Sequence, residues 1–298
     1  MIMNKHQTFQ LFKYTAIALI GASALLLTIA MLTVYEPNTN YFPSNAPLPL
    51  FAVLCALVGA TCGIVSSFLT NPEKTNASPF SVPAALLCAG GFLFGGLLLL
   101  SGSTLSQAPL TAFFFFIAAL YSLLSAFASP KAASSVTVIL GFLTVIACAL
   151  GNVYCYFDVS LEMNAPVKII LQTALLFTMI YYTAEIRFLL AREKKRFYLV
   201  LAFCALAAST MGAVAVPIAY FSGALNRTDY FALSVVLLGV ALSLLVRILF
   251  YTHPQKEDTA EPILTEGSTT SPTYNNGEPD IPLTDDDIAN DQKETDEE

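Results

Sequence analysis

Two charged residues, Glu185 and Arg247, lie within long apolar runs of the sequence, where a charged side chain is costly and often marks a functional site. Glu185 lies 17 residues after Lys168, and Arg247 lies 17 residues after Tyr230. If both runs are helices that begin at the same surface, each residue lies about 25 Å along its helix. We therefore predict that Glu185 and Arg247 form an ion pair on the cytoplasmic side. Side chains more than about 8 Å apart would exclude the pair.

Neighbours at helical spacing place both residues on faces that contact protein rather than lipid. The face of Glu185 carries Ala174, Thr178, Tyr181 and Arg192, and the face of Arg247 carries Ala232, Val236, Gly239 and Ser243. Small or polar side chains of this kind favour contact between helices. The sequence leaves one alternative open: Arg247 turns toward lipid phosphates, while Glu185 pairs with Arg192 or with water.

The other reactive residue types form no catalytic or metal-binding pattern. Both histidines, His6 and His253, lie outside the apolar runs. The six cysteines lie inside these runs without a C-x-x-C pair, whereas a disulfide framework or a zinc site needs clustered ligands. We therefore expect no catalytic residue, no metal, no bound cofactor and no nucleic-acid partner. The prediction is that this chain is not an enzyme.

Eight apolar runs position these residues, and each is long enough to cross about 30 Å of hydrocarbon as a helix. They are Tyr14–Val34, Leu48–Thr70, Val82–Leu100, Leu110–Ala128, Val136–Phe157, Val167–Leu190, Phe197–Phe221 and Tyr230–Phe250. Hydrophobic residues make up 56% of the chain, and its mean hydropathy is +0.66. The sequence thus predicts an all-α, multi-pass membrane protein in contact with the lipid bilayer, with one membrane domain over residues 1–253.

The first apolar run resembles a secretory signal peptide in its position and in the lysines that precede it. Its apolar core is about 20 residues long, however, and exceeds the usual length of about 7–15 residues. We therefore expect an uncleaved span, which makes the number of spans even.

The distribution of basic residues predicts the side of the membrane on which each loop lies. The link between the sixth and seventh runs contains Arg192, Lys194, Lys195 and Arg196. A basic cluster of this kind stays in the cytoplasm. With both termini inside, ten bases lie in cytoplasmic segments, and only Lys168 and Arg227 lie in outer segments. We therefore predict a plasma-membrane protein (cell inner membrane) with both termini in the cytoplasm.

Residues 254–298 differ sharply in composition from the rest of the chain. They hold 14 of its 21 acidic residues and two of its bases. Because this segment has too few apolar side chains to offset the entropy of an ordered chain, we predict a disordered acidic tail. The tail and the basic link share the predicted compartment, and either could bind a protein partner. A latch between them that competes with anionic lipid is the specific hypothesis. A solvated tail with ordinary topology charge is the simpler one.

Small residues predict where helices approach each other closely. Gly59 and Gly63 form one G-x-x-x-G pattern, and Gly91 and Gly95 form another. Such faces bring two helix backbones together, either within one bundle or between two copies, so the oligomeric state stays open. Pro217 interrupts the seventh run and predicts a kink there, because proline lacks a backbone donor.

These observations leave more than one class of function. We expect a non-enzymatic sensor or partner-binding scaffold that acts through its inner loops and tail. The alternative is a permease-like transporter for a small neutral or apolar solute, without ion coupling, because no chain of acidic and basic groups crosses the runs. A polar cavity that reaches the middle of the bundle would favour the permease, and a solid middle would favour the scaffold.

Overall fold

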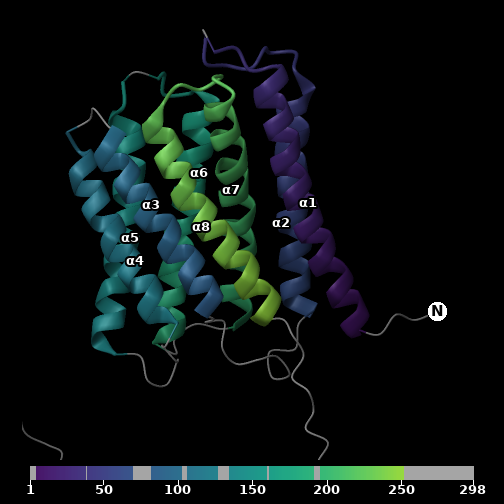
Figure 1. Ribbon diagram of the computed structural model, residues 1–298. Coiled ribbons are helices and arrows are strands. Elements are labelled where there is room, and N and C mark those ends of the chain that lie inside the picture. The colour runs from purple at the N-terminus through teal and green to yellow at the C-terminus, as the bar shows by residue number, and fades with distance from the viewer. Residues whose placement is uncertain are drawn as a thin grey trace, which may run out of the picture. The chain divides into compact units, whose positions relative to one another are not determined.

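The computed structural model describes residues 5–37, 39–69, 82–102, 106–126, 134–159, 161–190 and 195–251 (Figure 1). Eight helices make up almost all of these residues: α1 (Lys5–Thr33), α2 (Pro47–Leu69), α3 (Val82–Gly102), α4 (Ala108–Ser125), α5 (Ser135–Phe157), α6 (Pro166–Leu189), α7 (Lys195–Phe221) and α8 (Thr228–Tyr251). All eight are long and apolar enough to cross a membrane. The prediction of an all-helical chain with eight such helices is confirmed. The acidic tail, residues 254–298, lies outside the described residues.

The helix ends follow from local sequence chemistry. Proline is the first residue of α2 and of α6 and the second of α4, where its missing N–H would have no helical partner anyway. At the start of α5, the Ser134 hydroxyl accepts a hydrogen bond of 3.2 Å from the backbone N–H of Thr137. This side chain therefore caps an otherwise unbonded donor.

The last six helices form a ring in chain order. Each of α3 to α7 packs against the next helix, α8 packs against α3 to close the ring, and α6 also contacts α8. The α1–α2 hairpin lies outside the ring and packs against α7 (Figure 1). We call the end of the bundle that carries residues 39–46 and 161–165 the upper end, as in Figure 1, and the opposite end the lower end.

The two G-x-x-x-G patterns lie at contacts within the chain. A methyl group on Gly91 would lie 2.7 Å from the Cα of Gly239, so α3 and α8 touch through their backbones. Gly95 faces α8 one turn further up, next to Val236. Gly59 lies against α1, and Gly63 lies against Phe203 of α7. These glycines therefore serve internal packing between helices.

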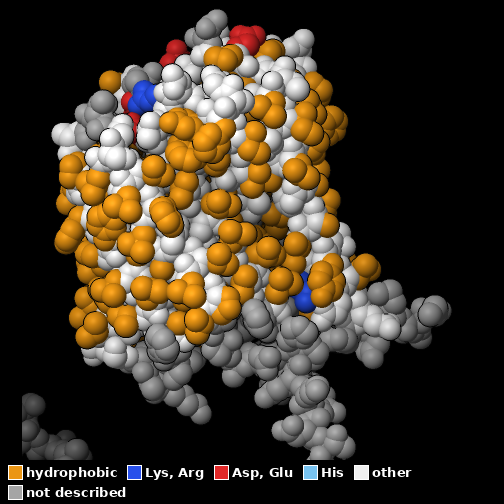
Figure 2. Space-filling view, in the orientation of Figure 1, with side chains coloured by type: hydrophobic (Ala, Val, Ile, Leu, Met, Phe, Trp, Pro, Cys, Tyr) orange, Lys and Arg blue, Asp and Glu red, His pale blue; other side chains and the backbone are white. Residues whose placement is uncertain are grey.

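The outside of the bundle is apolar over most of its height (Figure 2). Large hydrophobic side chains are exposed on every helix, as on α2, where Leu50 and Phe68 are each 62% exposed. Charged side chains that can be seen in Figure 2 gather at the upper end, apart from a basic one near the lower end. Such a surface would be unstable in water and suits lipid chains. The chain is therefore a membrane protein.

Candidate functional site

Glu185 and Arg247 meet inside the ring near its lower end. The Nη1 atom of Arg247 lies 2.5 Å from Oε2 of Glu185, well within the 8 Å limit that the sequence analysis set. Both side chains are buried: that of Glu185 is 0% exposed and that of Arg247 is 4% exposed. The alternative in which Arg247 turns to lipid is not the arrangement in this structure.

Hydroxyl groups from three other positions surround the ion pair. The Tyr121 hydroxyl donates to Oε1 of Glu185 at 3.0 Å. Nη1 of Arg247 donates to the Tyr181 hydroxyl at 2.9 Å, and Nη2 donates to the Ser125 hydroxyl at 3.4 Å. We call Glu185, Arg247, Tyr121, Ser125, Tyr181 and Tyr198 the lower cluster. It joins four helices, α4, α6, α7 and α8, because the Tyr181 and Tyr198 hydroxyls lie 2.6 Å apart.

The helices bring this cluster together because each contributes a residue from its lower end. Ser125 is the last residue of α4, and Tyr198 is near the start of α7. Glu185 follows Tyr181 by four residues, so both point from one face of α6. The small and polar faces predicted for α6 and α8 are buried, with the side chains of Ala174 and Ala232 each 0% exposed. Arg192, which belonged to the predicted face of Glu185, lies outside the described residues.

A second polar group borders the lower cluster on its upper side. The Cys88 thiol of α3 lies 2.9 Å from the Tyr182 hydroxyl, and the Ser122 hydroxyl donates to the same sulfur at 3.3 Å. The Tyr182 ring contacts the Tyr121 ring edge to face, with centroids 6.0 Å apart. Above Tyr182 the neighbouring side chains are apolar, since the Tyr182 ring next contacts the ring of Phe92 on α3.

Burial decides what the ion pair can do. Removing two charges from water costs several kcal/mol per ion, and their attraction offsets this cost only when the remaining polar atoms are also bonded. Here both carboxylate oxygens of Glu185 accept hydrogen bonds, and both terminal nitrogens of Arg247 donate, Nη1 to two acceptors and Nη2 to one. Among the polar atoms of the pair, the buried Nε of Arg247 has no hydrogen-bond acceptor within the described residues. The cluster is therefore a polar network bonded at every other atom of the pair, and it becomes costly to disturb at any single residue.

A separate group of charges lies at the upper end. The Asp158 carboxylate accepts from Nη2 of Arg227 at 3.0 Å and from the Tyr230 hydroxyl at 2.7 Å. Lys168, whose side chain is fully buried, donates to the backbone carbonyls of Asp158 and Leu161 at 2.8 and 3.4 Å. We call Asp158, Lys168, Arg227 and Tyr230 the upper cluster. It fixes the loop between α5 and α6 to the start of α8.

A tyrosine also ties the α1–α2 loop to the α5–α6 loop at the upper end. The Tyr41 hydroxyl lies 2.7 Å from Oε2 of Glu162 and 2.6 Å from Oδ1 of Asn164. The hydrogen bond to the Glu162 carboxylate raises the pKa of Tyr41 above its ordinary value, because ionisation would remove the donated proton. This contact connects the hairpin to the ring in addition to the packing of α1 and α2 against α7.

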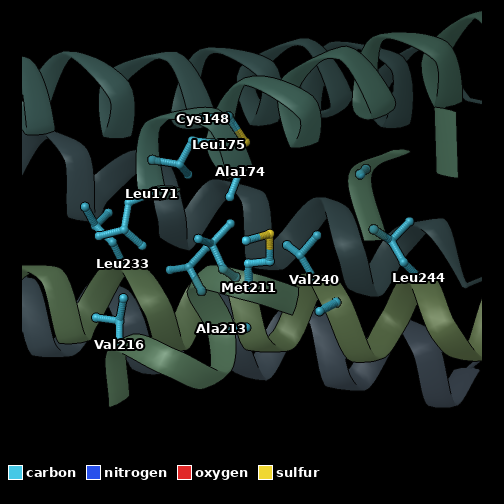
Figure 3. Packing of buried hydrophobic residues seen from close by; sticks show 14 of the residues in the cluster. Cys148, Leu171, Ala174, Leu175, Met211, Ala213, Val216, Leu233, Val240 and Leu244 are labelled. Carbon is cyan, nitrogen blue, oxygen red and sulfur yellow. The ribbon is translucent and has the colours of Figure 1, made fainter. Parts of the chain in front are cut away.

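Apolar side chains fill the ring between the two clusters (Figure 3). A methyl group on Gly212 of α7 would lie 3.2 Å from Leu237 of α8 and 3.3 Å from Leu171 of α6. On the other side of the ring, a methyl group on Gly151 would lie 3.2 Å from Leu175. Side chains from neighbouring helices thus pack closely into the interior, and buried apolar residues fill the described middle of the bundle.

The remaining predicted site residues do not join either cluster. Arg192 and Lys194 of the basic link lie outside the described residues. Lys195 is the first residue of α7, and Arg196 follows it with an exposed side chain. Pro217 lies inside α7, and the predicted kink stays a prediction. Within the described ranges, no group of three His, Cys, Asp or Glu residues could hold a metal ion.

Sequence reasoning missed the partners that complete the two clusters. Tyr121 and Ser125 come from an aromatic-rich apolar run, and nothing in that run marks the face that meets Glu185. Asp158 and Arg227 are 69 residues apart and carry no shared motif. Tyr121 precedes Ser125 by four residues near the end of its run, and this spacing is the one weak signal that could have indicated Tyr121. No protein-family model, curated protein or solved structure matches the chain.

Proposed function

We propose that the chain is a non-enzymatic membrane protein that acts as a sensor or as a scaffold for a protein partner. The observation that supports this proposal is the solid apolar layer between the lower cluster and the upper cluster. A solute that crossed the ring would have to displace side chains such as Leu171 and Leu175, both fully buried. The charged side chains of each cluster bond mainly to groups of the same cluster. A change of state therefore has to move helices.

We further propose that both termini lie in the cytoplasm and that the protein resides in the plasma membrane. The lower end then faces the cytoplasm, because ten of the twelve bases before residue 254 fall in segments on that side. The basic link, the acidic tail and the lower cluster would share this side. A partner would therefore meet the basic link or the tail on this side of the membrane.

The proposed orientation can be tested by labelling introduced cysteines in intact cells with a membrane-impermeant maleimide. Ser44 is exposed in the α1–α2 loop, and Arg196 is exposed at the start of α7. We expect Ser44→Cys to react in intact cells and Arg196→Cys to react only after permeabilisation. The unmodified chain supplies the background from its six native cysteines. Labelling of Arg196→Cys in intact cells would show that the start of α7 faces outward and would refute the proposed topology.

The scaffold and the permease predict different results for the purified protein. In liposomes, we expect the shrinkage rate in a panel of small neutral solutes to equal that of protein-free vesicles. In nanodiscs, a scaffold should retain a partner at constant stoichiometry. Deletion of residues 254–298, or reversal of charge at Arg192, Lys194, Lys195 and Arg196, should then release this partner. Saturable flux of one neutral solute, with no partner retained, would favour the permease instead.

A further inference from the structure

Two side-chain amides lie within the membrane-spanning part of neighbouring helices, at almost the same depth. Asn152 is five residues before Phe157, the last residue of α5, and Gln172 is six residues after Pro166, the first residue of α6. At about 1.5 Å per residue, both amides lie about 8–9 Å below the upper ends of their helices. The two helices, of 23 and 24 residues, exceed about 30 Å of hydrocarbon by only a few Å, so both amides lie inside it.

Helical spacing places both amides where α5 and α6 meet. Asn152 lies about three turns after Gly141, and Gln172 lies about four turns before Ile186. Gly141 and Ile186 are in contact, since a methyl group on Gly141 would lie 2.8 Å from the Ile186 side chain. Both amides are half-buried, so neither is enclosed by the contact between the two helices. The amides therefore lie at the lipid-facing edge of the α5–α6 contact.

Hydrogen bonds within the chain use little of the capacity of these amides. Nδ2 of Asn152 donates at 3.4 Å to the carbonyl of Cys148 in its own helix, and the Gln172 side chain forms no hydrogen bond with another described residue. Thr173, the next residue, adds an exposed hydroxyl at this depth. Each amide offers two donors and an acceptor, and hydrocarbon offers no partner for them. In membranes, amides of this kind bond across helices.

The loop above the same two helices shows the opposite mismatch. Val159 is 94% exposed and Met163 is 53% exposed, and both lie between the end of α5 and the start of α6. Apolar side chains at this level face water rather than hydrocarbon. We call Asn152, Gln172, Thr173, Val159 and Met163 the α5–α6 face. It presents polar groups to lipid and apolar groups to water, and a surface that suits neither solvent suits a protein partner.

A second copy of the chain supplies the groups that this face needs. A two-fold axis along the membrane normal brings each depth of one copy opposite the same depth of the other. Asn152, Gln172 and Thr173 lie within about 3 Å of one depth, so the donors of each copy meet the acceptors of the other. A different membrane partner would match only with polar groups of its own at this level.

We propose that two copies of the chain associate through the α5–α6 face, with Asn152 and Gln172 of each copy hydrogen-bonded to the polar groups of the other. The exposed loop residues Val159 and Met163 then cover one another at the upper surface. This proposal goes beyond the proposed function and does not depend on it, because a scaffold and a permease could each work as such a dimer.

Photocrosslinking in membranes tests which surface the second copy covers. Leu176 is 46% exposed on α6, one turn below Gln172, and Leu57 is 58% exposed on α2, away from the proposed contact. We expect p-benzoylphenylalanine in place of Leu176 to give an adduct of two chains, which co-expression of two differently tagged copies identifies. The same group in place of Leu57 should give lipid adducts alone. Lipid adducts alone at Leu176, or an adduct with a different protein, would overturn the proposal.

Single-molecule photobleaching in liposomes, over a series of protein-to-lipid ratios, tests the amides themselves. Asn152→Leu combined with Gln172→Leu should raise the dissociation constant of the dimer about tenfold, because interhelical hydrogen bonds are lost. Thr61→Leu is the matched control: this exposed hydroxyl on α2 bonds to the carbonyl of Val58 in its own helix, so association should not change. Monomers at every ratio, or an unchanged dissociation constant in the folded amide variant, would overturn the proposal.

A second variant keeps the test decisive if the amide variant does not fold. Val159→Ser combined with Met163→Ser changes residues outside the helices, so the bundle should fold as before. Loss of their mutual burial should raise the dissociation constant several-fold, in the same liposome measurement. An unchanged dissociation constant in this variant would show that the loop is not covered by a second copy and would refute the proposed dimer.

Discussion

The backbone contact between α3 and α8 predicts opposite effects for the same substitution at two glycines, Gly239 at the contact and Gly90 beside it. A methyl group on Gly239 would lie 2.6 Å from the Cα of Gly91 and 2.7 Å from the carbonyl oxygen of Leu87. These are backbone atoms, so no rotamer change can relieve the overlap. A methyl group on Gly90, the neighbour of Gly91, would meet no atom within 4 Å. Gly239→Ala and Gly90→Ala therefore add the same methyl group in opposite surroundings.

The magnitude follows from how far the helices must separate. Ordinary contact with a methyl carbon begins at 3.4 Å, so Gly239→Ala pushes α3 and α8 apart at their crossing. A gap of about 0.5–1 Å forfeits about a quarter to a half of the dispersion energy of the atoms involved, and overpacking of this kind costs about 1–3 kcal/mol. Gly90→Ala should instead be neutral or stabilising by up to about 1 kcal/mol, because alanine favours the helix.

Thermal unfolding in detergent measures this difference when the fraction of protein that stays monodisperse is recorded at each temperature. Because about 1 kcal/mol changes Tm by about 2–4 °C in a domain of this size, Gly239→Ala should lower Tm by about 2–12 °C. Gly90→Ala should leave Tm unchanged or raise it slightly. Gly91→Ala should behave like Gly239→Ala, since a methyl group there would lie 2.7 Å from the Cα of Gly239. Equal Tm values for Gly239→Ala and Gly90→Ala would refute the close contact.

Three further predictions concern the polar clusters and one turn. Glu185→Gln and Arg247→Gln should each destabilise the protein by about 3–5 kcal/mol, whereas the double variant should lose far less than their sum, because it leaves no unpaired charge. Thermal unfolding of all four chains of this cycle measures the coupling, and additive losses would contradict it. Asp158→Asn should cost about 1–2 kcal/mol, since Arg227 is 27% exposed and water screens its charge. Its Tm loss should add to that of Arg247→Gln, as expected for clusters at opposite ends. Gly223→Ala should lower the free energy of unfolding, measured at equilibrium, by about 1 kcal/mol. Gly223 has a φ of 78° and open space around it, so this loss comes from backbone strain and not from a steric clash.

Hydropathy was sufficient to find the eight helices. In lipid, a spanning segment must form hydrogen bonds among its own backbone polar groups, so each long apolar run has to be a helix. Helical spacing was also sufficient to place Glu185 and Arg247 on protein-facing sides. The sequence could not tell that α8 closes the ring against α3, since Gly239 has no second glycine at the spacing of the G-x-x-x-G pattern. Tyr121 was missed for a related reason: in a helix that is apolar on all sides, hydrophobicity does not distinguish the inner face from the lipid face.

The arrangement of polar groups within the bundle limits how the two membrane surfaces can influence each other. The upper cluster joins the α5–α6 loop to α8, and the lower cluster joins α4, α6, α7 and α8. α6 and α8 are present in both, with Lys168 and Glu185 on α6 and Tyr230 and Arg247 on α8. Apolar side chains separate the clusters, and none of the hydrogen bonds described above runs from one cluster to the other. Coupling between the two ends would therefore have to pass through rigid displacement of α6 or α8.

The contact of Gly91 with Gly239 opposes such displacement of α8. A variant that loosens this contact should thus make the lower cluster respond to changes at the upper one. The chain contains no tryptophan, so Leu245→Trp adds a single fluorescent reporter on α8 two residues before Arg247, and Gly239→Ala combined with Asp158→Asn in this reporter chain tests the coupling directly. An emission maximum that shifts only when both substitutions are present would indicate coupling through α8, and emission equal to that of the single variants would exclude it.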